Sequence, residues 1–185
     1  MNSPAPITLE DADTVLAIIS LGANLPSEFG SPRVVVEQAL LALQLLSETP
    51  VQRSSCYLTA ALDCPPDAPD FINAIALLRV SRSLDAASLL CELHRIEANF
   101  GRQRGTGLNQ PRSLDLDLIS FGTVESQEST LRLPHPRAHE RRFVLAPLAE
   151  LAPGLRLPGH ARTVSDCSPC WVRTRFCVDS KEKYL

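Results

Sequence analysis

The stretch GRQRGTGLNQPRSLDLDLISFG, residues 101–122, places two aspartates one residue apart inside an apolar alternation. Successive side chains of a strand point to opposite faces, so the leucines of this strand share one face while Asp115 and Asp117 share the other. Asp is depleted in strands, and two like charges on one face repel. Either the strand is half-exposed with solvated acids, or a ligand offsets the repulsion.

Three arginines precede this pair in the sequence, Arg102, Arg104 and Arg112. Two carboxylates with no His or Cys beside them suit Mg²⁺, which takes one or two carboxylates together with waters and phosphates. A metal and arginines around a phosphate form the electrostatic arrangement that phosphoryl transfer needs. The glycine-containing loop between them is either a closing loop over a nucleotide or an ordinary loop. The sequence has no P-loop signature, which excludes the common ATP-binding mode.

The composition fits one globular domain. The chain has 185 residues, of which 44% are hydrophobic and 21% charged, and its net charge of −3 makes a general attraction to nucleic acid weak. No apolar run approaches the ~20 residues of a membrane helix, and the first fourteen residues do not read as a signal peptide. We therefore expect a cytoplasmic protein whose six cysteines are free thiols.

The hydrophobic periods predict strands and helices in a fixed order. Strands are expected at residues 15–25, 51–59, 71–80 and 114–121, with a further short one near LRLPHP, and helices at 32–46, 84–101 and 139–153. The first helix keeps helical spacing at Val35, Ala39, Ala42 and Leu46, and the second is expected to line one face with Leu89, Leu93 and Ile96. In the second helix, Ser83 or Asp85 is a candidate N-cap and Gly101 a candidate C-terminal residue. Pro147 is expected to interrupt or end the third helix.

This order, β-α-β-β-α-β and then a helix, predicts an α+β fold. We expect a ferredoxin-like antiparallel sheet with helices packed on one face, an additional C-terminal helix, and the other sheet face open. Residues 1–14 are expected to form a poorly ordered lead, residues 15–165 a single domain, and residues 166–185 a variable tail.

The sequence resembles the family of 6-hydroxymethyl-7,8-dihydropterin pyrophosphokinases, enzymes of folate biosynthesis. The block at 101–122 carries the resemblance, together with four further blocks in the expected order: SLGANL, DFINAIALL, HRIEANFGR and LPHPRAHERRFVLAPLAELAP. The likeness covers residues 15–158. It implies that the domain is a monomeric ATP- and Mg²⁺-dependent diphosphotransferase. ATP and hydroxymethyl-dihydropterin would be its substrates, AMP would be released, and neither nucleic acid nor a membrane would be a partner.

The resemblance also implies roles for particular residues. Asp115 and Asp117 would hold two Mg²⁺ ions, and Arg102 and Arg112 would be the catalytic arginines. The other implied residues bind ATP (Glu97, Arg104, His135 and Arg141) or the pterin (Leu62, Phe71, Asn73 and Phe143). Phe71 and Asn73 are two residues apart and share one strand face, where an aromatic ring and an amide suit a flat polar heterocycle. Without the resemblance, we would favour core packing for Phe71 and a turn-adjacent amide for Asn73.

Several alternatives stay open. An RNA-binding ferredoxin-like module would need exposed aromatic residues and a basic sheet face, whereas only 5% of the residues are aromatic. A degenerate family member would bind nucleotide without turnover. The pair Cys167-x-x-Cys170, with His160 and Cys177 nearby, would need four suitably spaced ligands to form a structural zinc site. We favour a variable tail over a zinc or redox site.

Overall fold

The computed structural model describes residues 7–60, 68–102 and 112–167. The elements follow the chain in the order β1 (Thr14–Ala23), α1 (Pro32–Gln44), β2 (Gln52–Arg53), β3 (Tyr57–Thr59), β4 (Phe71–Ser81), α2 (Ala86–Asn99), β5 (Asp115–Phe121), β6 (Ser126–Glu128), β7 (Leu131–Leu133), the 3₁₀ helix η1 (Ala138–Glu140) and α3 (Arg142–Leu151). No helix among these described residues is long and apolar enough to cross a membrane.

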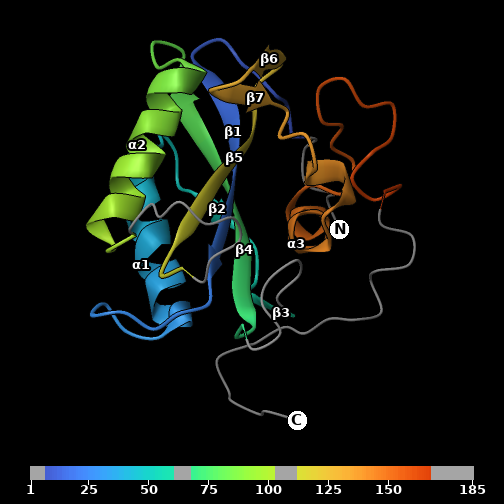
Figure 1. The fold of residues 1–185 in the computed structure, drawn as a ribbon. Helices are drawn as coiled ribbons and strands as arrows, with labels where there is room; N and C mark the ends of the chain where they lie inside the picture. Colours follow the sequence, from blue (N-terminus) through green and yellow to red (C-terminus); the bar gives the residue numbers. More distant parts are fainter. Residues whose placement is uncertain (1–6, 61–67, 103–111, 168–185) are drawn as a thin grey trace.

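The strands form one main antiparallel sheet. Its order is β2-β4-β1-β5, β3 pairs with the same edge of β4 as β2, and every pairing is antiparallel. Helices α1 and α2 lie on one face of this sheet, and α3 lies on the other (Figure 1). The expected antiparallel sheet with helices is therefore confirmed. The C-terminal helix adds a third layer that makes the open face smaller than we expected.

The first face of the sheet carries the larger core. The leucines of β5 alternate as predicted, and Leu114, Leu116 and Leu118 join α1 and α2 in one buried cluster. Leu89, Leu93 and Ile96 form the buried stripe of α2, as predicted from their spacing. The side chain of Asp85 caps this helix by accepting a hydrogen bond from the amide of Ser88 at 2.7 Å.

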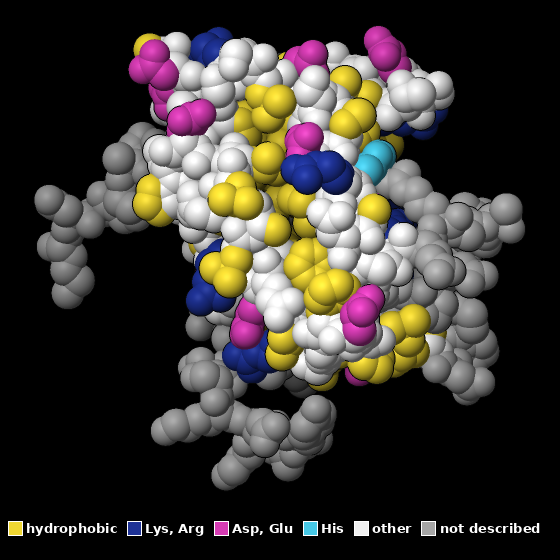
Figure 2. All heavy atoms as spheres, turned by 90° about the vertical axis from the view of Figure 1, so that its left-hand side faces the viewer, with side chains coloured by type: hydrophobic (Ala, Val, Ile, Leu, Met, Phe, Trp, Pro, Cys, Tyr) yellow, Lys and Arg dark blue, Asp and Glu magenta, His cyan; other side chains and the backbone are white. Residues whose placement is uncertain are grey.

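Helix α1 buries a stripe that only partly matches the expected one. Val35 and Ala39 are buried as expected, together with Val36, Leu40 and Leu43. Ala42 and Leu46, which were also expected there, are partly buried against the same cluster. Leu41 and Leu45 are instead 73% and 88% exposed. Figure 2 shows apolar side chains at the surface of the side of the molecule where α1 and α2 lie. Because α1 is apolar around most of its circumference, its sequence does not select one stripe.

The second face of the sheet is covered at one end only. A second cluster joins buried residues of β1, β4, β5 and α3: Leu16, Ile18, Ile75, Leu77, Ile119, Val144, Leu145 and Leu148. The expected helix at 139–153 is split, because Arg141 is extended between η1 and α3. The prediction that Pro147 interrupts or ends the helix is wrong, since Pro147 lies buried inside α3, where packing offsets the lost hydrogen bond.

The strand expected at 51–59 is two short strands separated by a bulge. Arg53 pairs with Ala76 and Tyr57 with Asn73, so this segment holds one residue more than the matching part of β4. The cause is Ser54: its amide donates to the carbonyl of Ile75, while its Oγ accepts from the Ile75 amide at 2.9 Å. The Oγ of Ser54 thus takes the place of a backbone carbonyl as acceptor for the Ile75 amide, which interrupts the regular backbone hydrogen bonding between the two strands.

Residues 7–14 are attached to the domain. The carbonyl of Leu9 accepts from the amide of Leu16, and the carboxylate of Glu10 accepts from Thr123 and pairs with Arg82. These bonds join the described part of the N-terminal lead to the domain, and residues 1–6 lie outside the described part. The short strand expected near LRLPHP is β7, which pairs with β6 in a hairpin that we did not expect.

We expect Ser54→Ala to lower the free energy of unfolding by about 1–3 kcal/mol, because the buried amide of Ile75 loses its acceptor. Chemical denaturation monitored by circular dichroism measures this loss. Ser31→Ala is the control, since the Ser31 side chain makes no cap hydrogen bond at the start of α1. Equal stability of the two variants would contradict this account of the bulge.

Candidate active site

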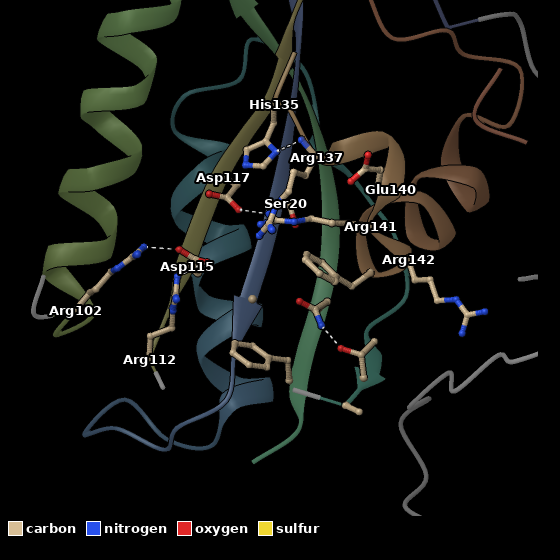
Figure 3. A pocket seen from close by; sticks show the side chains of 16 residues that line it. Ser20, Arg102, Arg112, Asp115, Asp117, His135, Arg137, Glu140, Arg141 and Arg142 are labelled. Atoms are coloured by element: carbon tan, nitrogen blue, oxygen red, sulfur yellow. Dashed lines mark hydrogen bonds and ion pairs between the residues drawn. The ribbon is translucent and has the colours of Figure 1, made fainter. Parts of the chain in front are cut away.

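A cavity of about 470 Å³ opens on the end of the second sheet face that α3 leaves uncovered. Figure 3 shows its lining side chains converging from the sheet, from the end of α2 and from the η1–α3 region. The lining residues are Ser20, Gly22, Thr59, Ala60, Phe71, Asn73, Arg102, Arg112, Asp115, Asp117, His135, Arg137, Glu140, Arg141, Arg142 and Phe143. Segments far apart in sequence therefore build one site.

The pairing register sets the floor of the cavity. Gly22 of β1 lies opposite Asn73 of β4 on one side and opposite Asp115 of β5 on the other. Ser20, two residues earlier, lies opposite Asp117. A polar row thus crosses the sheet, with glycine at its centre. A Cβ on Gly22 would lie 3.1 Å from Oδ1 of Asn73, so glycine keeps the middle of this floor open.

Arginines surround the two aspartates from both ends of the cavity. Asp115 accepts hydrogen bonds from Nη1 of Arg102 at 2.5 Å and from Nη1 of Arg112 at 2.8 Å. Asp117 faces Nη1 of Arg141 at 3.5 Å. Figure 3 shows Arg102 and Arg112 meeting Asp115, and Arg141 meeting Asp117. The cavity therefore combines acceptors for a cation with donors for an anion.

The two carboxylates are close enough to influence each other. Burial, followed by the charge of Asp115, raises the pKa of Asp117 to about 6, although Arg141 acts in the opposite direction. A divalent cation between them would remove this repulsion. Within the described ranges, no group of three or more His, Cys, Asp and Glu side chains is arranged to hold a metal ion. Two carboxylates nevertheless fit magnesium, which completes its shell with water and phosphate.

His135 is neutral at physiological pH. Burial, then the charges of Arg141 and Arg137, lower the pKa of His135 to about 4. Its Nδ1 accepts a hydrogen bond from the backbone amide of Arg137 at 3.3 Å, which leaves the ring proton on Nε2. The guanidinium of Arg141 also lies 5.3 Å from the ring centre of Phe143. This end of the cavity is rich in donors and suits an anionic ligand.

The other end suits a flat polar ligand. Asn73 is 4% exposed, and its Nδ2 donates to Oγ1 of Thr59 at 2.7 Å. This bond fixes the amide and leaves one N–H and the carbonyl oxygen for other partners. Phe71 and Phe143 both contribute aromatic surface to the lining of this cavity.

Glu97 lies beneath the cavity and is not among its lining residues. Its side chain is 1% exposed, accepts from the amide of Leu116 at 2.7 Å and pairs with Arg102. We expected Glu97 to contact ATP. Its position instead indicates that it orients Arg102 and anchors β5.

Asn24 joins the ends of the two loops beside the cavity. It is 2% exposed; its Oδ1 accepts from the amide of Arg112 at 2.9 Å, and its Nδ2 donates to the carbonyl of Pro69 at 3.1 Å. The amides of Asn24 and Leu25 donate to the carbonyl of Arg112. We did not expect Asn24 to have this role.

Most of the residues that we expected in the site line this one cavity. The cavity is lined by Arg102, Arg112, Asp115, Asp117, His135, Arg141, Phe71, Asn73 and Phe143. Arg104 and Leu62 lie outside the described residues. We missed Ser20, Gly22, Arg137, Glu140 and Arg142; alternation along β1 could have indicated the first two, since they share a face. Figure 3 shows Arg142 extending away from the aspartates.

The cysteine-containing tail is described only as far as Cys167. Cys167 shares a second, smaller pocket with His139 and His160, whose ring centres are 4.8 Å apart. Cys170 and Cys177 lie outside the described residues. Cys56, Cys91 and Cys167, which lie within them, are free thiols, as expected.

Comparison with known proteins gives the family. The family described as 7,8-dihydro-6-hydroxymethylpterin-pyrophosphokinase (HPPK) matches residues 18–153. The chain is 36% identical to 2-amino-4-hydroxy-6-hydroxymethyldihydropteridine pyrophosphokinase of Synechocystis, over 84% of this chain and 78% of that protein. It is 40% identical to the protein of the same name from Pseudomonas aeruginosa, over 76% of this chain and 82% of that protein.

A solved structure supports the fold. Plasmodium falciparum HPPK-DHPS with pterin and p-hydroxybenzoate superposes with a TM-score of 0.64, at 13% identity, over 89% of this chain. The chain spans 44% of the length of that larger protein. This likeness therefore concerns the fold alone.

We expect Asp117→Asn to stabilise the metal-free protein at pH 7.5. The fold favours the neutral form of Asp117, so its contribution to stability is present below the unfolded pKa near 4 and is lost as the pH rises through about 6. Asn mimics the neutral carboxyl at every pH.

Melting temperatures measured with chelator between pH 4 and pH 7.5 check this prediction. The variant should melt at a higher temperature than wild type at pH 7.5, and this difference in melting temperature should become smaller towards pH 4. Asp13→Asn, at an exposed position, serves as the control. A variant that melts lower than wild type at pH 7.5 would show that the charged carboxylate is not a cost to the metal-free fold.

Proposed function

The chain belongs to the 7,8-dihydro-6-hydroxymethylpterin-pyrophosphokinase family, and from this premise we propose how it works as a pyrophosphokinase of folate biosynthesis. It transfers a diphosphate from ATP to the hydroxymethyl oxygen of 6-hydroxymethyl-7,8-dihydropterin. The oxygen attacks the β-phosphorus, the bond to the α-phosphate breaks, and AMP leaves.

One observation supports this proposal above the others. The paired carboxylates Asp115 and Asp117 line the same cavity as Arg102, Arg112 and Arg141, and that cavity continues to the amide of Asn73. Anion-binding and heterocycle-binding surfaces thus meet in one space. Such a site can align two substrates, and alignment supplies much of the acceleration in phosphoryl transfer.

Magnesium fits the donor set, and we assign two ions to Asp115 and Asp117. Bound there, magnesium would neutralise phosphate charge and help to activate the attacking hydroxyl. Asp115 also orients the side chains of Arg102 and Arg112 through hydrogen bonds of 2.5 and 2.8 Å. These two arginines then stabilise the negative charge that develops on the phosphates.

The pterin binds at the Asn73 end of the cavity. The oriented amide of Asn73 reads the polar edge of the ring, and Phe71 and Phe143 stack against its faces. The fixed amide geometry supports this role, because it leaves one donor and one acceptor for the ligand. Leu62 is assigned to the same subsite from the family resemblance alone.

ATP binds at the arginine-rich end. His135 donates from Nε2 and Arg141 from its guanidinium to the phosphates, and Arg104 adds a cation from the loop. Glu97 acts indirectly by orienting Arg102, as their ion pair supports. We further propose a ferredoxin-like topology, supported by the order β2-β4-β1-β5, and a monomeric state.

The test is to incubate the protein with ATP, Mg²⁺ and 6-hydroxymethyl-7,8-dihydropterin and to separate the adenine nucleotides by chromatography. AMP should form only when all three are present. ADP would mean a different reaction, and calorimetric ATP binding without turnover would mean a degenerate member of the family.

Asp117→Asn should lower turnover in this assay by at least about 100-fold, because it removes charge from the metal site without changing its shape. Circular dichroism confirms that the variant is folded, and Asp13→Asn is again the control. Turnover close to wild type in a folded Asp117→Asn protein would overturn the metal-site assignment.

Gly22→Ala should raise the KM for the pterin about 10-fold or more, because the new Cβ would displace the Asn73 amide, a loss comparable to one hydrogen bond to the ligand. Steady-state kinetics with each substrate varied measures the change. Gly154→Ala is the matched control, since a Cβ there meets nothing within 4 Å. An unchanged KM would show that Gly22 does not shape the pterin subsite.

A further inference from the structure

We propose that Glu150 is a positioning residue for the pterin subsite: it fastens helix α3 to strand β3 and thereby sets the two walls between which the pterin binds. This inference rests on the proposed function. It adds a residue that lies outside the cavity lining and that the sequence analysis did not consider.

Three groups of the β2–β3 segment donate to the carboxylate of Glu150. Oε1 accepts from the amide of Ser55 at 3.1 Å and from its Oγ at 2.9 Å, and Oε2 accepts from the hydroxyl of Tyr57 at 2.9 Å. These groups are 93 and 95 residues away in sequence. Hydrogen bonds to a charged acceptor are stronger than neutral ones, and here both oxygens are used.

The bulge at Ser54 sets which residues of β4 lie opposite β3. It adds one residue before β3, so the register that pairs Arg53 with Ala76 becomes one that pairs Tyr57 with Asn73. Ser55, Tyr57 and Thr59 are spaced by two residues, which places their side chains on one face where β3 is extended. The first two bind Glu150, and the third binds the amide of Asn73.

A continuous path therefore runs from α3 to the ligand-reading amide. Glu150 holds Tyr57, Tyr57 lies opposite Asn73 in the sheet, and Thr59 fixes the Asn73 side chain at 2.7 Å. If Glu150 releases β3, Thr59 is less constrained and the Asn73 amide can turn. The Asn73 wall of the pterin subsite thus depends on a contact made at the far edge of the sheet.

The same helix carries the opposite wall. Phe143 and Glu150 are seven residues apart on α3, which is two helical turns and therefore the same side of the helix. Fixing Glu150 against β3 fixes where Phe143 lies relative to Phe71. The carboxylate and its three donors therefore add a polar restraint to the apolar packing of α3 against the sheet.

The test compares Glu150→Ala, Glu150→Gln and Tyr57→Phe. Glu150→Ala should raise the KM for the pterin and its dissociation constant, measured from pterin fluorescence, by roughly 5- to 20-fold, as expected for one or two lost hydrogen bonds. The KM for ATP should rise less than the KM for the pterin, because Arg102 and Arg112 lie outside α3. Arg141, which adjoins the N-terminus of α3, also pairs with Asp117 of β5. Tyr57→Phe should show a smaller effect of the same kind.

Glu150→Gln should largely restore pterin binding, since an amide keeps one acceptor for Ser55 and can donate to the Tyr57 hydroxyl. Glu92→Ala is the control, as this glutamate pairs with Arg95 on α2 and does not line the cavity. The double variant Glu150→Ala/Tyr57→Phe should bind the pterin as well as Glu150→Ala alone does. Both substitutions remove the same connection between α3 and β3, so their effects should not add.

The outcomes separate this inference from the proposed function. A lower melting temperature with unchanged pterin binding would reduce Glu150 to a stabilising residue and overturn the proposal. Equal increases in both KM values would also overturn it, because they would show a general distortion of the site. A wild-type protein that neither binds pterin nor forms AMP would overturn the proposed function, and this inference with it.

Discussion

The repulsion between Asp115 and Asp117, and the way in which the protein balances it, governs the arrangement of the site. Two adjacent carboxylates on one strand face are unfavourable unless cations surround them. Arg102 and Arg112 approach Asp115, and Arg141 approaches Asp117. This balance is incomplete, since burial and then the charge of Asp115 still raise the pKa of Asp117 to about 6. The remaining unfavourable energy is what a divalent cation and its phosphate ligands can relieve.

Unequal coverage of the sheet creates the space for this chemistry. The face that meets α1 and α2 is buried along its length, whereas α3 covers only one end of the other face (Figure 1). On β1, the same face passes from buried Leu16 and Ile18 to the cavity-lining Ser20 and Gly22. One strand therefore contributes first to a core and then to a site, and the alternation of its side chains serves both.

Buried polar residues hold Arg102 and Arg112 in place beside the sheet. Glu97 ties Arg102 to the amide of Leu116, and Asn24 ties Arg112 to Pro69. Each of these bonds satisfies a group that would be costly to bury alone. Glu97 and Asn24 thus contact the cavity arginines from outside the cavity lining, and we propose a comparable role for Glu150 at the Asn73 end.

The order of the main strands and helices could be predicted from the sequence, because hydrophobic period reflects the backbone directly. The aspartate-arginine block carried the family resemblance. Phe71 and Asn73 could be placed on one face, since residues two apart on a strand share a face. Only tertiary contacts fix which stripe of the largely apolar α1 is buried, that Pro147 stays inside α3, and that Ser54 breaks a strand. These outcomes depend on partners distant in sequence, as do the positions of Glu97 and Gly22 relative to the cavity, and no local pattern encodes such contacts.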